Sequence, residues 1–365
     1  MPSLEDMKLD PYAALGVNKW INASCHWTTV GGTLEPDVVL DSIRAAAGNY
    51  VNVMELQKAA GRIIAEYTHA ENGYIVSGCA AGMLVGTAAV LTGTDMANIQ
   101  ALPHLTGTGM KSRVIANRFP REKTSDGREY INYGYAQAVR TTGIEFDEVG
   151  VDEHPVSAEE LDAAFGADTA MVYWGTEEPP GHLTVEEVAE ISHSHGVPVL
   201  VDNSNHLPPR ENLWRYIEAG GDLVAFSGGK GIQGPQGSGI LAGRADLIEA
   251  VAMQSAPSHG IGRVCKVSKE EIIGQLTALI WWAEGDPEER MSEHFRKSQQ
   301  LNGQLSSLTG ISTDVRFPDF SGRPYPTVII TVGATDGRTG TDILNELAGG
   351  NPPILAMADP GNTRA

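Results

Sequence analysis

A single lysine, Lys230, stands among six glycines in the stretch FSGGKGIQGPQGSG, residues 226 to 239, directly after an apolar run. A lysine in such a loop can hold an anion by its charge, or it can bond to a carbonyl if its amine is uncharged part of the time. The P-loop is excluded, because that motif needs glycine at Val224 and serine or threonine at Gly231. The S-x-x-K motif is excluded too, because it belongs at a helix start, where consecutive glycines are unfavourable.

A solvated lysine on a surface turn is the simplest alternative for Lys230. It gives no role to the glycines on both sides, whereas glycine allows backbone and ligand to approach closely. A covalent bond would require a carbonyl partner, and pyridoxal phosphate would supply one. Pyridoxal phosphate has two further requirements: N–H donors for its phosphate and a carboxylate for its ring nitrogen.

The sequence contains one candidate for the phosphate-binding N–H groups and one for the carboxylate. The stretch SGCAAGM, residues 77 to 83, is a turn of small residues between a predicted strand and a predicted helix, so its amides can point at a phosphate. Asp202 ends the apolar run VPVLVD, where a carboxylate is costly unless it is paired. Alone, the turn could be a packing turn and Asp202 a cap, but their occurrence with Lys230 favours the cofactor interpretation.

Apolar runs alternate with helical patterns through the first two thirds of the chain, which predicts an α/β fold with a mostly parallel sheet flanked by helices. In such sheets ligands bind beyond the carboxyl ends of the strands, so we expect Ser77, Asp202 and Ser227 to share one edge. Beyond residue 245, two long helical patterns and two strand patterns predict a smaller α+β domain. The strand candidates are residues 113–117, 169–174, 197–202, 222–227 and 238–243.

The composition limits the classes of binding partner. The formal charge is −20, with 26 basic against 46 acidic residues, and such an acidic surface makes nucleic acid an unfavourable partner. Neither a membrane-spanning run nor a signal peptide is recognisable. The three cysteines fit neither a disulfide framework nor a zinc spacing, so we expect a reducing cytoplasm and no metal.

Several motifs together resemble those of the fold-type-I pyridoxal-phosphate enzymes, whose fold is aspartate aminotransferase-like. The similar segments include INAS, GGTLEPDVV, ELQKAAGRIIAEYT, SGCAAG, LVAFSGGK, LPPRENL and IGRVCKVSKEEIIG. Among these enzymes the chain is most similar to the branch that contains selenocysteine synthase-like proteins and D-glucosaminate-6-phosphate ammonia-lyase. The likeness extends over residues 20 to about 335.

The resemblance implies roles for individual residues. Lys230 would form the Schiff base with pyridoxal phosphate, and Asp202 would pair with the ring nitrogen. Arg263 would hold a phosphate or a substrate carboxylate, from its own subunit or a neighbouring one. The phosphate would be bound by Ser77, Gly78, Cys79, Ala80 and Ser227.

The resemblance also implies an arrangement of the chain: residues 1–45 contribute to the site and to a subunit interface, residues 46–245 form the cofactor-binding domain, and residues 246–365 form the small domain. Sites of this family are completed by a neighbouring subunit, so we expect a homodimer or a larger homo-oligomer.

Two segments depart from the pattern of these relatives. Cys25, His26 and Trp27 follow INAS, and Asn203, Ser204, Asn205 and His206 follow Asp202. His26 and His206 are candidates for acid–base chemistry, with local backbone contacts an equal alternative, while Trp27 and Asn205 are candidates for substrate binding. His193 and His195 are expected to be solvated, and Tyr133, Tyr135 and Arg118 are weak options for stacking on the cofactor ring.

By resemblance we expect a lyase acting on a small hydroxylated amino acid or an amino-sugar acid, by β-elimination and deamination. Racemisation or aldol cleavage of a related amino acid is the alternative. Selenium transfer on a charged tRNA would require a basic surface, which the composition does not favour. A scaffold without cofactor would not need both Lys230 and Asp202.

Overall fold

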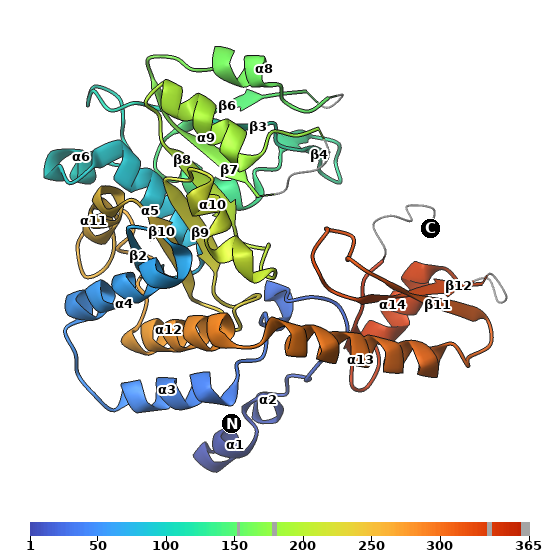
Figure 1. The fold of residues 1–365 in the computed structure, drawn as a ribbon. Coiled ribbons are helices and arrows are strands. Elements are labelled where there is room, and N and C mark those ends of the chain that lie inside the picture. Colours follow the sequence, from blue (N-terminus) through green and yellow to red (C-terminus); the bar gives the residue numbers. More distant parts are fainter. Residues whose placement is uncertain (152–153, 177–180, 334–337, 359–365) are drawn as a thin grey trace. The chain divides into compact units, whose positions relative to one another are not determined.

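The computed structural model describes residues 1–151, 154–176, 181–333 and 338–358 (Figure 1). The chain divides into two compact units. The sheet unit comprises Thr33–Gly285, and the terminal unit comprises Met1–Gly32 with Asp286–Ala365.

The sheet unit is built on a seven-stranded sheet in the order β2-β10-β9-β8-β7-β3-β6. All neighbouring pairs are parallel except those of β10, which runs antiparallel to β2 and to β9. The mostly parallel α/β sheet expected from the sequence is therefore confirmed. The strands are β2 (Asn72–Val76), β3 (Arg113–Asn117), β6 (Glu145–Val149), β7 (Thr169–Gly175), β8 (Val199–Asn203), β9 (Leu223–Ser227) and β10 (Gly239–Gly243).

Helices cover both faces of this sheet, which is why its strands are apolar on both sides. In β8, Val199 and Val201 belong to one hydrophobic cluster, while Leu200 between them belongs to the other. The helices of the unit are α3 (Asp37–Ala47), α4 (Val53–Thr68), α5 (Cys79–Thr92), α6 (Met96–Ala101), α7 (Gln137–Arg140), α8 (Ala158–Ala163), α9 (Val185–Ser194), α10 (Arg215–Glu218), α11 (Ala245–Gln254) and α12 (Lys269–Glu284). Shorter elements are η2 (Gly134–Ala136), η3 (Arg210–Leu213) and the hairpin of β4 (Arg121–Lys123) with β5 (Glu129–Ile131).

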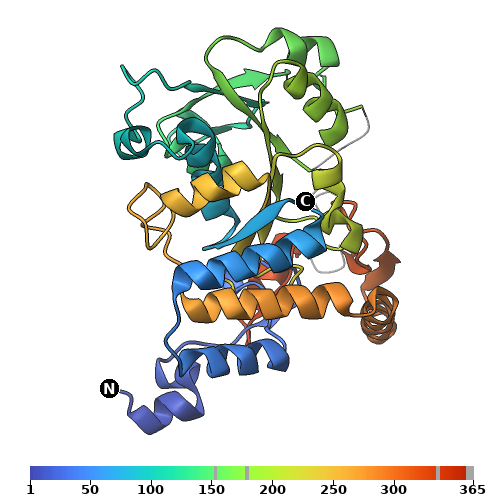
Figure 2. The same cartoon turned by 60° about the vertical axis from the view of Figure 1, so that its left-hand side comes forward.

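Helix α12 belongs to the sheet unit, although the sequence pattern suggested that the small domain begins at residue 246. The helix packs beside α3 and α4 (Figure 2). It buries Ile272, Leu279 and Trp282 in the hydrophobic cluster that also contains residues of the sheet. The sequence pattern changes at residue 246, but burial of the apolar face of α12 holds this helix in the sheet unit. The boundary between the units therefore falls at Gly285.

The terminal unit combines both ends of the chain. Strand β1 (Ile21–Asn22) pairs in parallel with β13 (Ile354–Leu355), which places the start of the chain with its last described part. The antiparallel pair β11 (Ile311–Arg316) and β12 (Thr327–Val332) packs against α13. The remaining elements are α1 (Leu4–Leu9), α2 (Pro11–Ala14), η1 (Thr28–Val30), α13 (Pro287–Leu305) and α14 (Gly340–Ala348).

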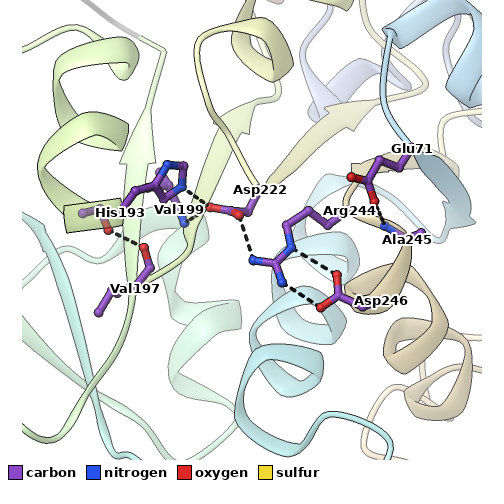
Figure 3. Close-up of polar contacts among 9 residues, drawn as sticks. Glu71, His193, Val197, Val199, Asp222, Arg244, Ala245 and Asp246 are labelled. Carbon is purple, nitrogen blue, oxygen red and sulfur yellow. Dashed lines mark hydrogen bonds and ion pairs between the residues drawn. The ribbon is translucent and has the colours of Figure 1, made fainter. Parts of the chain in front are cut away.

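A buried carboxylate, Asp222, ties together three segments of the sheet unit (Figure 3). Its Oδ2 lies 2.8 Å from His193 Nε2 and accepts the Val199 N–H at 2.8 Å, while its Oδ1 accepts a hydrogen bond from Arg244 Nη1 at 3.1 Å. His193 and His195 are thus paired with carboxylates rather than only solvated, since His195 Nε2 lies 2.7 Å from Asp162 Oδ1.

Replacing Asp222 with alanine is expected to lower the free energy of unfolding by about 2–3 kcal/mol, because the Val199 N–H is left buried without an acceptor and two charge-assisted contacts are lost. Asp246→Ala is the matched control. It also removes a carboxylate partner of Arg244, but an exposed one, so its expected cost is below about 1 kcal/mol. Urea unfolding measures both, and equal costs would contradict this account of the network.

Among the described residues, no helix is both long enough and apolar enough to cross a bilayer. The same residues contain no group of three or more His, Cys, Asp or Glu side chains arranged to hold a metal ion.

Candidate active site

Three segments with candidate site residues meet at the carboxyl edge of the sheet. Strand β2 leads into Ser77, β8 contains Asp202, and β9 ends at Ser227, three residues before Lys230. These strands run in the same direction, because β10 is antiparallel to both β2 and β9 while β8 is parallel to β9. The edge shared by Ser77, Asp202 and Ser227 is thus the one expected from the sequence.

The turn between β2 and α5 leads into the start of a helix whose first N–H groups are not used by the residues that the structure describes. Gly78 adopts φ +89°, and a Cβ there would meet nothing within 4 Å. In the described part of the chain, the N–H groups of Cys79, Ala80 and Ala81 have no protein acceptor, and α5 has no side-chain cap. A helix start with free donors suits a phosphate group. The Ser77 hydroxyl is already used, because it donates to the Cys265 carbonyl at 3.0 Å.

Asp202 is surrounded by neutral donors. Its Oδ2 accepts the Tyr173 hydroxyl at 2.9 Å, and its Oδ1 accepts the Ser204 N–H at 3.0 Å. The Cys79 thiol lies 3.7 Å from Oδ1. No ion pair joins Asp202 to a Lys, Arg or His of the described residues. This carboxylate therefore suits a cationic N–H of a bound group, such as the protonated ring nitrogen of pyridoxal phosphate.

Burial keeps the two side-chain donors on Asp202 protonated. The pKa of the Cys79 thiol is raised well above its usual value by burial and by the charge of Asp202, and the charge of Lys230 opposes this shift. Burial, followed by the charge of Asp202 and their hydrogen bond, likewise raises the pKa of Tyr173. Neither group is a nucleophile or a base near neutral pH, so both act as permanent donors.

The glycines around Lys230 are needed for packing against protein. A Cβ at Gly228 or Gly234 would come within 2.1 or 2.3 Å of the Gln275 side-chain oxygen, and one at Gly231 would come within 2.2 Å of the Leu207 carbonyl. These glycines, interpreted from the sequence as room for a ligand, instead make close contacts with α12 and with the segment after β8. The loop is thereby held against rigid elements.

Lys230 itself is half-buried, and its Nζ lies 5.6 Å from the centre of the Tyr135 ring. Its backbone is fixed from a distant part of the chain, because the Thr33 hydroxyl contacts the carbonyls of Gly229 and Lys230 at 3.1 and 3.3 Å. A lysine on a fixed backbone with a half-buried side chain is suited to form a bond with a ligand carbonyl.

A cavity of about 400 Å³ opens beside Asp202 at the same edge. Asn205 and His206, both singled out from the sequence, line it together with Arg118 and Thr176. His206 Nδ1 lies 2.5 Å from the Thr176 hydroxyl, which in turn contacts the Asp202 carbonyl at 3.2 Å.

The remaining predicted residues lie elsewhere. Arg263 is exposed in the segment between α11 and α12. His26 and Trp27 belong to the terminal unit, where His26 Nδ1 lies 3.2 Å from Cys25 Sγ and the Trp27 indole donates to Ser24 Oγ at 3.1 Å. Their roles in the site stay predictions.

Sequence reasoning missed Tyr173, Thr176 and Gln275. Tyr173 carried a usable signal, because a tyrosine in the middle of a buried apolar strand needs a partner for its hydroxyl. Gln275 is fully buried in an apolar helix, which is a comparable signal. Thr176 follows β7 directly, and nothing in its sequence context distinguishes it from other threonines.

Comparison with known proteins agrees with this geometry. Residues 134–346 match the family described as aminotransferase class-V. The chain is 31% identical to 5'-C-glycyluridine monooxygenase-decarboxylase of a Streptomyces species over 350 residues, which cover 94% of this chain and 83% of the relative. It is 27% identical to D-glucosaminate-6-phosphate ammonia lyase of Salmonella typhimurium over 352 residues, which cover 94% of this chain and 88% of that one.

A solved structure of a D-glucosaminate-6-phosphate ammonia-lyase superposes with a TM-score of 0.80 at 26% identity, over 95% of this chain and 89% of that one. The neighbour has the fold-type-I architecture that the sheet order and the loop of Lys230 indicated. The chain therefore belongs to the aminotransferase class-V family, and it is a fold-type-I enzyme that uses pyridoxal phosphate.

Proposed function

We propose that this enzyme is a lyase that removes water and ammonia from an amino-sugar acid or a similar hydroxylated amino acid. The observation that carries the proposal is Asp202, a carboxylate held by neutral donors at the same sheet edge as Lys230 and the open start of α5. The similarity to an ammonia-lyase over 94% of the chain supports the choice of reaction. The water that leaves in the elimination is matched by one that hydrolyses the resulting imine, so the net change is R–CHOH–CH(NH3+)–COO− → R–CH2–CO–COO− + NH4+.

Each site residue has a part in this reaction. When bound, pyridoxal phosphate would withdraw electrons from the Cα of an attached amino acid and so make its proton removable. The N–H groups of Cys79, Ala80 and Ala81 would bind the phosphate, with Ser227 and Ser77 beside them, and Asp202 would hold a proton at the ring nitrogen. Lys230 would hold the cofactor and, once released, take the proton from Cα.

His206 is proposed to deliver a proton to the departing hydroxyl. It lines the cavity beside Asp202, and its contact with Thr176 orients the ring. Asn205 lines the same cavity and is proposed to bind hydroxyl groups of the substrate, while Arg263 is proposed to bind its carboxylate or a phosphate. His26 is proposed as a further candidate for acid–base chemistry, and Trp27 as a candidate for substrate binding.

A second candidate function comes from the relative that is 31% identical. That protein is named a monooxygenase-decarboxylase, so its reaction consumes O2 and releases CO2. An amino acid whose Cα proton has been made acidic can be oxidised by O2 and decarboxylated. The balanced equation is R–CH(NH2)–COOH + O2 → R–CO–NH2 + CO2 + H2O. The two reactions therefore differ in gas exchange as well as in the fate of nitrogen.

The proposed function is tested by supplying the holoenzyme with three substrates in turn: D-glucosaminate 6-phosphate, D-glucosaminate without the phosphate, and 5'-C-glycyluridine. Each reaction is followed under air and under argon. We expect ammonia from an amino-sugar acid at equal rates under both gases. Ammonia-free turnover of 5'-C-glycyluridine with CO2 release only under air would establish the second candidate instead. Turnover that releases neither ammonia nor CO2 would indicate racemisation or aldol cleavage.

We also propose that the enzyme works as a homodimer or larger homo-oligomer in the cytoplasm. Large apolar side chains are exposed on residues 34–54 of the sheet unit; Leu34 is 93% exposed, for example. Val264, next to Arg263, is 86% exposed, which suits coverage by a second copy. The three cysteines are free thiols, as suits a reducing compartment.

A further inference from the structure

We infer that Tyr173 is a positioning residue that holds Asp202 in the orientation that the cofactor requires. Tyr173 lies in β7, two residues before Gly175, which pairs with Asp202 of β8. Its hydroxyl donates to Asp202 Oδ2 at 2.9 Å, while the Ser204 N–H holds Oδ1. The two oxygens are thus fixed from two sides. The inference rests on the proposed role of Asp202 as the partner of the ring nitrogen.

A half-buried carboxylate normally stays charged because a cation lies beside it. Asp202 lacks such an ion pair among the described residues, and its strong side-chain donor is a phenol that burial keeps protonated. A neutral donor orients the carboxylate without forming an ion pair with it. The carboxylate therefore stays available for a cationic ring nitrogen, whereas a neighbouring lysine or arginine would compete for it.

Other titratable or charged side chains lie near Asp202. Cys79 of α5 contributes a weak thiol donor at 3.7 Å, and the charge of Lys230 acts on that thiol. His206, His182 and Arg118 line the cavity that Asp202 shares. All of these groups remain in a variant that lacks only the Tyr173 hydroxyl, so the difference between that variant and the parent protein reports on Tyr173 alone.

The test is Tyr173→Phe, which removes one oxygen atom and preserves the ring. The dissociation constant of pyridoxal phosphate is measured on the cofactor-free protein by visible absorbance, kcat and KM are measured on the loaded enzyme, and far-UV circular dichroism follows folding. Without the phenol, Oδ2 of Asp202 loses the donor that holds it in place. We expect the dissociation constant of pyridoxal phosphate to rise and kcat to fall, each by about tenfold, while KM stays unchanged.

Tyr74→Phe is the matched control. Tyr74 is a buried tyrosine of β2 whose hydroxyl contacts the Ala256 carbonyl at 3.4 Å instead of Asp202, so the dissociation constant and kcat of its variant should equal those of the parent protein. Cys79→Ala supplies a second test that does not depend on the folding of the Tyr173 variant, with smaller changes in the same direction. Unchanged cofactor affinity and kcat in Tyr173→Phe, or equal losses in Tyr173→Phe and Tyr74→Phe, would overturn the inference. Failure of the parent protein to bind pyridoxal phosphate would instead refute the cofactor role of Asp202.

Discussion

Lys230→Ala is expected to abolish covalent cofactor binding and to reduce turnover by roughly a thousandfold or more. Without the amine, the protein can form no bond to the cofactor carbonyl and has no group at that position to take the Cα proton. The phosphate site at the start of α5 and Asp202 are untouched, so the variant should still bind pyridoxal phosphate, but without the visible absorbance of the lysine-bound form. The measurement is the absorption spectrum of the loaded protein together with ammonia release.

Lys111→Ala is a suitable control, because Lys111 is an exposed lysine of the same unit. It should keep both the spectrum and the rate. Activity of Lys230→Ala within about tenfold of the parent protein would show that another group performs the proton transfer.

Asp202→Asn is expected to reduce turnover by roughly a hundredfold to a thousandfold while cofactor binding persists. The amide is almost the same size as the carboxylate, but it cannot hold a proton on the ring nitrogen, so the cofactor withdraws electrons less well. The loss should fall on kcat rather than on KM, since Asp202 would contact the cofactor and not the substrate. Steady-state kinetics and the visible spectrum of the loaded variant measure the two effects separately.

Asp126→Asn, a change to an exposed carboxylate of the hairpin loop between β4 and β5, should leave both properties unchanged. A fully active Asp202→Asn enzyme would mean that the ring nitrogen is not the group that Asp202 binds.

Much of the fold was predictable because it follows from local pattern. The runs before Asp202 and Ser227 are buried on both faces, so their apolar character is continuous and marks them as strands. Chain direction then places Ser77, Asp202 and Ser227 at one edge. These inferences need no knowledge of distant contacts.

What escaped prediction depends on contacts between distant segments. The glycines near Lys230 are packed against Gln275 of α12, which is about 40 residues away, and Thr33 reaches the same loop from the start of the unit. The unit boundary at Gly285 depends on burial of α12 against α3 and α4, which a change in composition does not reveal. Tyr173 is bound to Asp202 through the pairing of β7 with β8, and single-sequence reasoning has no access to that register.

The central claim is that Lys230 bonds to pyridoxal phosphate, and reductive trapping tests it most directly. The loaded enzyme is treated with borohydride, which makes the lysine–cofactor bond permanent, and is then digested and analysed by peptide mass spectrometry. We expect the cofactor mass on the peptide that contains Lys230 and on no other lysine. A modification at a different lysine, or no modification of a protein that has bound the cofactor, would contradict it.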